Sequence, residues 1–314
     1  YVVHILLYMY YKLLGLEMTV TKILAFKAKP WMKDFITFNI DKRKEAKNDF
    51  EVDFFKLMNN SVYGKTMKNV RKRCNITVVD NEDKALKHIA NPSFVNLTKI
   101  NDIFLIIRKT KNEVKLDKPF YVGVAVLDYS KFLMYNYHYG IFKKLYGNKV
   151  KLLMTDTDSL FYEIKTDDVY KDLFGENSKC KDYFDTSNFE KTNPYYSDKN
   201  KKVNGKLKCE NADNMIGKFI GLKSKNYAFT YENELLNEKE KEKLIRCKGT
   251  TKATIKNEIH FDSLVNTLKE GKITKNDNYT IRSKNHKVSL CKINKISLSC
   301  YDDKRHILED GITS

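Results

Sequence analysis

Two apolar runs near the middle of the chain, residues 150–154 and 160–164, flank a short polar stretch. Apolar runs of this length, joined by a few turn-forming residues, predict a β-hairpin. Its tip carries Asp156 and Asp158, and two carboxylates at the end of buried strands are costly to desolvate unless a cation holds them. Hard oxygen ligands on a rigid tip suit Mg²⁺, which makes the tip a candidate metal site. An isolated Asp-x-Asp is more often an ordinary polar turn.

A second pattern lies upstream and follows the period of a helix. Lys56, Asn60 and Tyr63 are spaced i, i+4, i+7 and therefore share one helical face. Another face, able to pack inward, carries three apolar residues: Phe55, Met58 and Val62. The first face offers a cation, an amide and a phenol to a ligand. A solvated polar face is the alternative.

Residues 30–50 are also predicted to be helical, with Pro30 at the entrance. Arg43 and Lys47 are spaced i, i+4, and like charges in this arrangement repel each other unless an anion lies between them. A triphosphate would supply that anion, and Lys56 could join the grip. Taken alone, this lysine-rich stretch is more simply explained as solvated surface.

Together these residues resemble the motifs of family B DNA polymerases. Residues 56–64 match the fingers motif K-x-x-x-N-S-x-Y-G, and residues 156–159 match the palm metal motif D-T-D-S. Two shorter elements also match: R-K-x-x-K at Arg43, Lys44 and Lys47, and the primer-contacting K-x-Y at Lys225 and Tyr227. Order and spacing agree, which makes the joint match specific. The phrases at 59–67 and 302–305 resemble the protein-primed branch, found in viruses, linear plasmids and Polinton/Maverick transposons.

The resemblance implies an α+β fold with the right-hand arrangement of polymerases: a palm with an antiparallel sheet, helical fingers and a thumb. It implies palm at 1–29, fingers at 30–71, an insertion at 72–118, palm with the metal hairpin at 119–232 and thumb at 233–314. Over 119–139 we expect a strand start followed by a long apolar helix. Within the insertion we expect strands at 75–80 and 103–108 and a helix at 82–90. A plain structural hairpin explains that segment equally well.

The implied reaction is template-directed transfer of a nucleotide from a dNTP to a primer 3′-OH, catalysed by two Mg²⁺ ions, with Mn²⁺ as a substitute. Asp158 would be the main metal ligand and Asp156 a secondary one. The triphosphate would meet Arg43, Lys47, Lys56 and Asn60, with Tyr63 beneath the nascent base pair. Primer and duplex contacts are expected from Lys225, Tyr227, Lys248, Lys252, Arg282 and His286. The implied partners are primer–template DNA, dNTPs and, in the protein-primed branch, a terminal protein.

The sequence departs from the family pattern near its beginning. The first palm motif, a metal-binding Asp followed by Tyr-Pro, is not found, and neither is a proofreading exonuclease region. We therefore expect a C-terminal polymerase-domain fragment that is inactive alone. Met154 stands where many members carry an aromatic residue, and a flexible thioether can fill that volume.

Composition is compatible with this prediction. The formal net charge of +18 and the sequence pI of about 9.3 favour a polyanionic partner. Six cysteines without a CxxC pair argue against a zinc ribbon and a disulfide framework, so reduced thiols in an intracellular protein are expected. The apolar run 1–16 is too short and too interrupted for a membrane span, and a palm strand leading into a buried helix is expected there.

Two rival hypotheses remain from the sequence. A decayed polymerase remnant could act only as a DNA-binding module, although drift would not keep the metal and fingers motifs together. A reverse transcriptase shares the palm logic, but it would carry a Y-x-D-D hairpin and no counterpart of residues 56–64.

Overall fold

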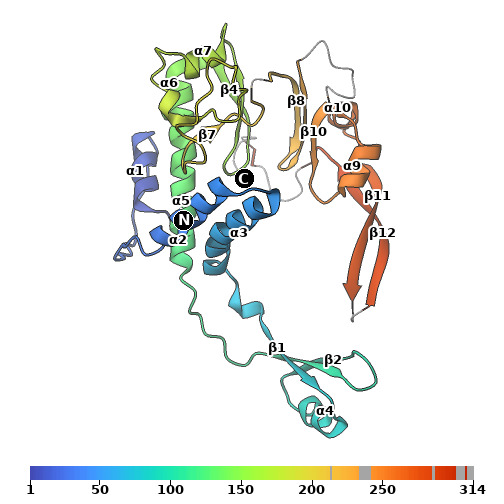
Figure 1. The fold of residues 1–314 in the computed structure, drawn as a ribbon. Helices are drawn as coiled ribbons and strands as arrows, with labels where there is room; N and C mark the ends of the chain where they lie inside the picture. Colours follow the sequence, from blue (N-terminus) through green and yellow to red (C-terminus); the bar gives the residue numbers. More distant parts are fainter. Residues whose placement is uncertain (213, 233–241, 285–286, 302–307, 310–314) are drawn as a thin grey trace. The chain divides into compact units, whose positions relative to one another are not determined.

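The computed structural model describes residues 1–212, 214–232, 242–284, 287–301 and 308–309. The chain divides into two compact units, Tyr1–Lys208 and Cys209–Ser314. Both units combine helices with small, mostly antiparallel sheets, so the predicted α+β class is confirmed (Figure 1). The predicted palm segment 119–232 extends across the division between the units.

Unit 1 opens with helix α1 (Ile5–Leu13), which packs on the long helix α5 (Phe120–Tyr135). Leu7 is fully buried, and the Tyr10 hydroxyl donates a hydrogen bond to the Tyr135 carbonyl at 3.2 Å. The predicted opening strand is wrong, because residues 1–4 form no regular element and their backbone leads directly into α1. None of the described helices is both long and apolar enough to cross a membrane.

Helices α2 (Lys33–Glu45) and α3 (Asp49–Thr66) pack against each other. The single helix predicted over 30–50 is wrong, because α2 ends before Ala46, whose backbone is extended at ψ 133°. The Asn48 side chain caps α3 by accepting from the amide of Glu51 at 2.9 Å, so a new helix starts here.

The end of α3 lies close against α5. Gly123 permits this approach, because a β-carbon there would overlap the Met67 side chain and lie 3.1 Å from the Thr66 hydroxyl. Thr66 is buried at this contact. The helix that carries the predicted fingers motif therefore packs against the helix that leads toward the predicted metal hairpin.

A small element follows α3 in the chain. It consists of β1 (Cys74–Val79), α4 (Glu82–Ile89), β2 (Phe94–Lys99) and β3 (Leu105–Thr110). The strands are antiparallel in the order β1-β3-β2, and α4 covers one face, where its Ala85 is buried together with Val79 and Ile107 of the strands. The predicted strand–helix–strand passage is confirmed, and β2 is a strand that the sequence pattern did not predict.

The polypeptide then forms one nearly continuous helical path into the hairpin. Pro119 is the N-cap of α5, so the strand start expected at this proline is wrong. Helix α5 continues through the π-helix η2 (Asn136–Phe142) and α6 (Lys143–Tyr146) into strand β4 (Val150–Thr155). Strand β5 (Leu160–Ile164) pairs with β4.

Loops and short elements cover one side of this hairpin. They are η4 (Lys181–Tyr183), helix α7 (Val169–Phe174) and the two-residue parallel strands β6 (Phe184–Asp185) and β7 (Leu207–Lys208). The core beneath them is aromatic and aliphatic, and its buried members are Phe142, Tyr146, Val150, Leu173 and Phe184.

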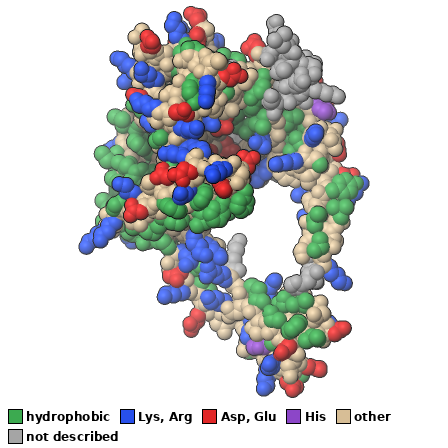
Figure 2. Space-filling model, in the orientation of Figure 1, with side chains coloured by type: hydrophobic (Ala, Val, Ile, Leu, Met, Phe, Trp, Pro, Cys, Tyr) green, Lys and Arg blue, Asp and Glu red, His purple; other side chains and the backbone are tan. Residues whose placement is uncertain are grey.

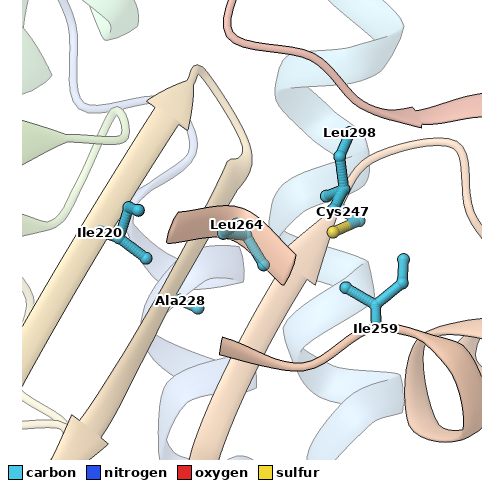
Figure 3. Close-up of a cluster of buried hydrophobic side chains, with 6 residues drawn as sticks. All are labelled: Ile220, Ala228, Cys247, Ile259, Leu264 and Leu298. Atoms are coloured by element: carbon cyan, nitrogen blue, oxygen red, sulfur yellow. The ribbon is translucent and has the colours of Figure 1, made fainter. Parts of the chain in front are cut away.

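Unit 2 is built on the antiparallel sheet β10-β9-β8, with β8 at Ile216–Lys223, β9 at Asn226–Tyr231 and β10 at Glu242–Cys247. Helices α9 (Lys252–Glu258) and α10 (Phe261–Glu270) follow, then a long hairpin of β11 (Thr274–Lys284) and β12 (Lys287–Leu298). Figure 3 shows how sheet, helix and hairpin share one core of six side chains: Ile220, Ala228, Cys247, Ile259, Leu264 and Leu298.

All six cysteines are free thiols in the structure. Burial of Cys247 in the core of unit 2 raises the pKa of its thiol to about 11.

Candidate active site

The predicted acidic hairpin is confirmed. Strands β4 and β5 pair antiparallel from Val150 opposite Ile164 to Thr155 opposite Leu160, with a bulge between Leu152 and Met154. The bulge lies close to the tip, where extra twist re-aims the strand end. The two carboxylates therefore stand at the end of a well-paired hairpin.

The tip is a tight turn closed by its own backbone. The Asp156 amide donates to the Ser159 carbonyl at 3.1 Å, and the Ser159 amide donates back to the Asp156 carbonyl at 3.3 Å. Thr157 sits in the left-handed region with φ 61°, which a β-branched residue rarely adopts and which costs about 1–2 kcal/mol. The Asp158 side chain is exposed, whereas Asp156 is half-buried.

The hairpin is supported from behind by the π-helix. His138 of η2 stacks on Tyr162 of β5 with an interplanar angle of 6°, and its Nδ1 lies 2.9 Å from the tyrosine oxygen. Phe142 packs on the same tyrosine, with ring centroids 4.4 Å apart. Burial, with a smaller effect of the Lys143 charge, lowers the pKa of His138, and burial also raises the pKa of Tyr162. Both rings are therefore uncharged at neutral pH.

The predicted helical face is also present, on α3. Lys56 and Asn60 are exposed, whereas Tyr63 is half-buried. The three apolar residues of the other face are likewise half-buried: Phe55, Met58 and Val62. Hydrophobic side chains also gather on the outer surface of the α2–α3 pair, among acidic and basic ones (Figure 2).

Tyr63 lines a groove of about 560 Å³ between α2, α3 and α5. Its walls are largely apolar, with Ile36 from α2 and Val126 from α5 among the lining residues. Asn59 also lines the groove, and its Oδ1 atom is buried without a hydrogen-bond partner among the described residues. Sequence reasoning did not select Asn59, although it sits one residue before the amide of the fingers motif.

Arg43 and Lys47 are not on one helix face, contrary to the prediction. Arg43 is in the last turn of α2, whereas Lys47 lies in the linker and its amide donates to the Glu51 carboxylate at 2.9 Å. The side chain of Lys47 is exposed. If both residues bind one triphosphate, Arg43 would do so from the end of α2 and Lys47 from the linker between α2 and α3.

In unit 2 the structure brings several predicted DNA-contacting residues together. Lys225 forms the turn between β8 and β9 with φ 60°, and its carbonyl accepts from the Lys248 amide at 3.1 Å. Tyr227 is the second residue of β9, the middle strand of the sheet, and lies opposite Gly221 on one side and Arg246 on the other. Lys252 begins α9 a few residues further on.

Two further residues were predicted to contact DNA, Arg282 and His286. Arg282 is exposed on β11. His286 and the phrase 302–305 lie outside the described residues.

The predicted Mg²⁺ site depends on the carboxylate ligands that the chain offers at the hairpin tip. Across the described ranges, no group of three His, Cys, Asp or Glu side chains is placed to hold an ion. The hairpin tip offers two carboxylates, and Mg²⁺ is commonly held by one or two carboxylates, with waters and substrate phosphates completing its shell. The tip fits that donor set. Lys56 and Asp158 belong to the same unit, and neither a hydrogen bond nor an ion pair joins them.

Comparisons with protein-family models, curated proteins and solved structures find no match for this chain.

Proposed function

We propose that this chain is the polymerase-domain part of a family B DNA polymerase of the protein-primed type. It would transfer nucleotides from dNTPs to a primer 3′-OH under the direction of a template. The observation that carries the proposal is the Asp156–Ser159 tip. The D-T-D-S residues, matched by motif, form a tight hairpin end with an exposed carboxylate at Asp158.

Each element has a role in the proposal. The β4–β5 hairpin belongs to the palm, the α2–α3 pair to the fingers, and the part of unit 2 from β10 onward to the thumb. Magnesium ions, when bound, supply charge neutralisation at the attacking and leaving oxygens. Asp158 would hold them with Asp156, and Lys56 would neutralise the triphosphate.

Tyr63 and the unit 2 residues would position the nucleic acid. Tyr63 forms part of a groove wall, where an aromatic ring can lie against a base. Lys225, Lys248 and Lys252 would contact phosphates near the primer end, which positions DNA without reading its sequence. In this role the protein works inside a host cell, on primer–template DNA.

The packing of the π-helix η2 against Tyr162 of β5 would help to hold the tip in place. Nucleotidyl transfer requires mostly positioning and electrostatic stabilisation, and small displacements of a ligand are costly. Tyr162 lies three residues beyond the tip and is packed and hydrogen-bonded by η2. The tip is thus connected to the core of unit 1 by a short path.

The alternative is a DNA-binding remnant, which the +18 charge alone would also explain. The test is extension of a primed template by the full-length protein that contains this chain. The proposal predicts Mg²⁺-dependent addition of the nucleotide complementary to the template. Tight binding of primer–template without any addition would favour the remnant.

A further inference from the structure

The turn between β8 and β9 is held by residues outside the two strands that it joins. It consists of Ser224 and Lys225, both exposed, and Lys225 has φ 60°. Side chains other than glycine rarely adopt this conformation, and it persists where the surroundings fix it. The Lys225 carbonyl accepts from the amide of Lys248, the residue after β10, at 3.1 Å. The conformation of the turn therefore depends on contacts beyond β8 and β9.

Two side chains that flank the turn reach the end of strand β12. On one side, Nδ2 of Asn226 donates to the Ser297 carbonyl at 3.1 Å. On the other side, the Lys223 ammonium donates to the Tyr301 carbonyl at 3.2 Å. The turn is thus bonded from both of its ends to one short segment, residues 297–301.

The side chain of Asn226 is buried, and both of its polar atoms have a partner. Asn226 is 4% exposed, and its Oδ1 atom accepts from the thiol of Cys247, its cross-strand neighbour in β10, at 3.5 Å. Burial raises the pKa of Cys247 to about 11, so this thiol keeps its proton at neutral pH. A buried amide whose hydrogen bonds are all made holds its neighbours in one arrangement.

The acceptor of Asn226 is itself firmly held. The Ser297 hydroxyl bonds the Thr274 carbonyl at 3.2 Å and also the side-chain oxygen of Asn276, both on β11. The next residue, Leu298, is fully buried and lies beside Cys247 in the core of unit 2 (Figure 3). The end of the β11–β12 hairpin therefore offers a rigid anchor to the turn.

A local need explains part of this arrangement. The register of β11 and β12 shifts at Ser297, and a residue at a bulge is left unpaired in the ladder, so its carbonyl needs another donor. Asn226 supplies that donor. The bulge does not explain why the Lys223 side chain ends on the same segment. Two contacts, one from each end of the turn, fix its position as well as satisfy a carbonyl.

We propose that Asn226 is a positioning residue, which fixes Lys225 relative to the β11–β12 hairpin. Through this contact the exposed Lys225 and the exposed Arg282 of β11 would meet the phosphates of one duplex as a single rigid unit. A rigid unit binds more tightly because less freedom is lost on binding. The duplex as ligand rests on the proposed polymerase function, whereas the hold on the turn rests only on the contacts of unit 2.

The first test follows the turn without nucleic acid. It measures hydrogen–deuterium exchange at the Lys248 amide in the full-length protein that contains this chain. Asn226→Ala should raise that rate about tenfold or more, and Lys223→Met about threefold, because the turn opens more often. Asn294→Ala is the matched control, since it removes an asparagine of β12 that is bonded to Asp277 away from the turn. It should change the rate by less than about twofold.

The second test is a double-mutant cycle on the binding of a fluorescent primer–template by the same protein. Lys225→Ala and Asn226→Ala should each weaken binding about fivefold, and the double variant less than about twofold further, because one contact is lost. Lys252, at the start of α9, lies outside the turn. Asn226→Ala with Lys252→Ala should therefore give the product of the two single effects. A purely structural role of Asn226 would affect both lysines alike.

The two tests separate this proposal from the proposed function. Unchanged exchange at Lys248 in both Asn226→Ala and Lys223→Met would overturn it, and so would additive effects of Asn226→Ala and Lys225→Ala on binding. Lys223 is only half-buried, so Lys223→Met decides if Asn226→Ala loosens the whole of unit 2. If Lys225→Ala binds primer–template like the wild type, the primer contact of the proposed function is wrong. The exchange rates then still decide whether Asn226 holds the turn.

Discussion

Tyr162 and His138 lie nearly parallel, with ring centroids 5.8 Å apart and 2.9 Å between the tyrosine oxygen and Nδ1. This pair joins strand β5 to the π-helix that follows α5. A π-helical segment inside an α-helix is rare and often occurs at functional sites. Here it places the imidazole against the strand that leaves the acidic tip, so the geometry of the tip depends on a contact made behind it.

Removal of the Tyr162 hydroxyl should weaken unit 1. Tyr162→Phe keeps the ring packing but leaves the His138 nitrogen without its partner, a loss of about 1–2 kcal/mol in the free energy of unfolding. Urea unfolding followed by the fluorescence of Trp31, the single tryptophan, measures it within unit 1. Tyr121→Phe is the matched control, because Tyr121 is exposed, and it should change stability by less than about 0.5 kcal/mol. Equal effects of the two variants would contradict the role of the hydrogen bond.

The same pair predicts a pH dependence. Burial lowers the pKa of His138 in the folded protein, so below about pH 6.5 the unfolded chain binds a proton that the folded one resists. The contribution of His138 is therefore complete above pH 6.5 and is lost as the pH falls below it. Thermal unfolding between pH 7.5 and 5.5 should show a steeper decline for the wild-type protein than for His138→Phe. Parallel curves would show that His138 titrates normally in the fold.

The cysteines should differ sharply in reactivity. Burial raises the pKa of Cys247 to about 11, whereas Cys74 is exposed. Since the thiolate is the reactive form, alkylation at pH 8 should be slower at Cys247 by about 10²-fold or more. Peptide mass spectrometry after timed iodoacetamide treatment measures both rates in one sample. Comparable rates in native buffer would mean that the core in Figure 3 is open.

Lys56 should act on the nucleotide rather than on DNA. In the full-length protein that contains this chain, Lys56→Ala removes the proposed charge-assisted contact and should lower kcat/KM for dNTP about ten- to a hundredfold. Lys65→Ala is the control. Lys65 is exposed near the end of the same helix and lies on the side of the helix opposite to Lys56. An effect of Lys56→Ala confined to the affinity for primer–template would remove Lys56 from the nucleotide site.

Local patterns predicted much of the fold around the site. The hairpin was predicted from two apolar runs around five polar residues, and α3 was predicted from the helical period of its polar and apolar positions. The break between α2 and α3 was placed a few residues too late, although Asn48 with Glu51 three residues later is the spacing of a helix start. The strand expected at Pro119 was wrong because a proline before an apolar helix can equally serve as its entrance.

Long-range contacts could not be predicted. The Lys202 ammonium donates to the Arg43 carbonyl, although the two residues are 159 positions apart in the chain. Nothing in the sequence around either residue indicates this contact. The groove beside Tyr63 needs the close approach of α3 to α5 at Gly123, which no pattern in either helix specifies alone. The sequence indicated the candidate site residues, whereas the residues that contact them in space are known only from the tertiary structure.

The central claim is that Asp158 is a metal-binding carboxylate of a polymerase. It is tested most directly by single-nucleotide incorporation with Mg²⁺, using the full-length protein that contains this chain. Asp158→Asn should abolish incorporation while the Kd for primer–template stays within about twofold. Asp167→Asn, an exposed carboxylate just beyond the hairpin, should behave like the wild type. A near-normal rate of incorporation by Asp158→Asn would contradict the account.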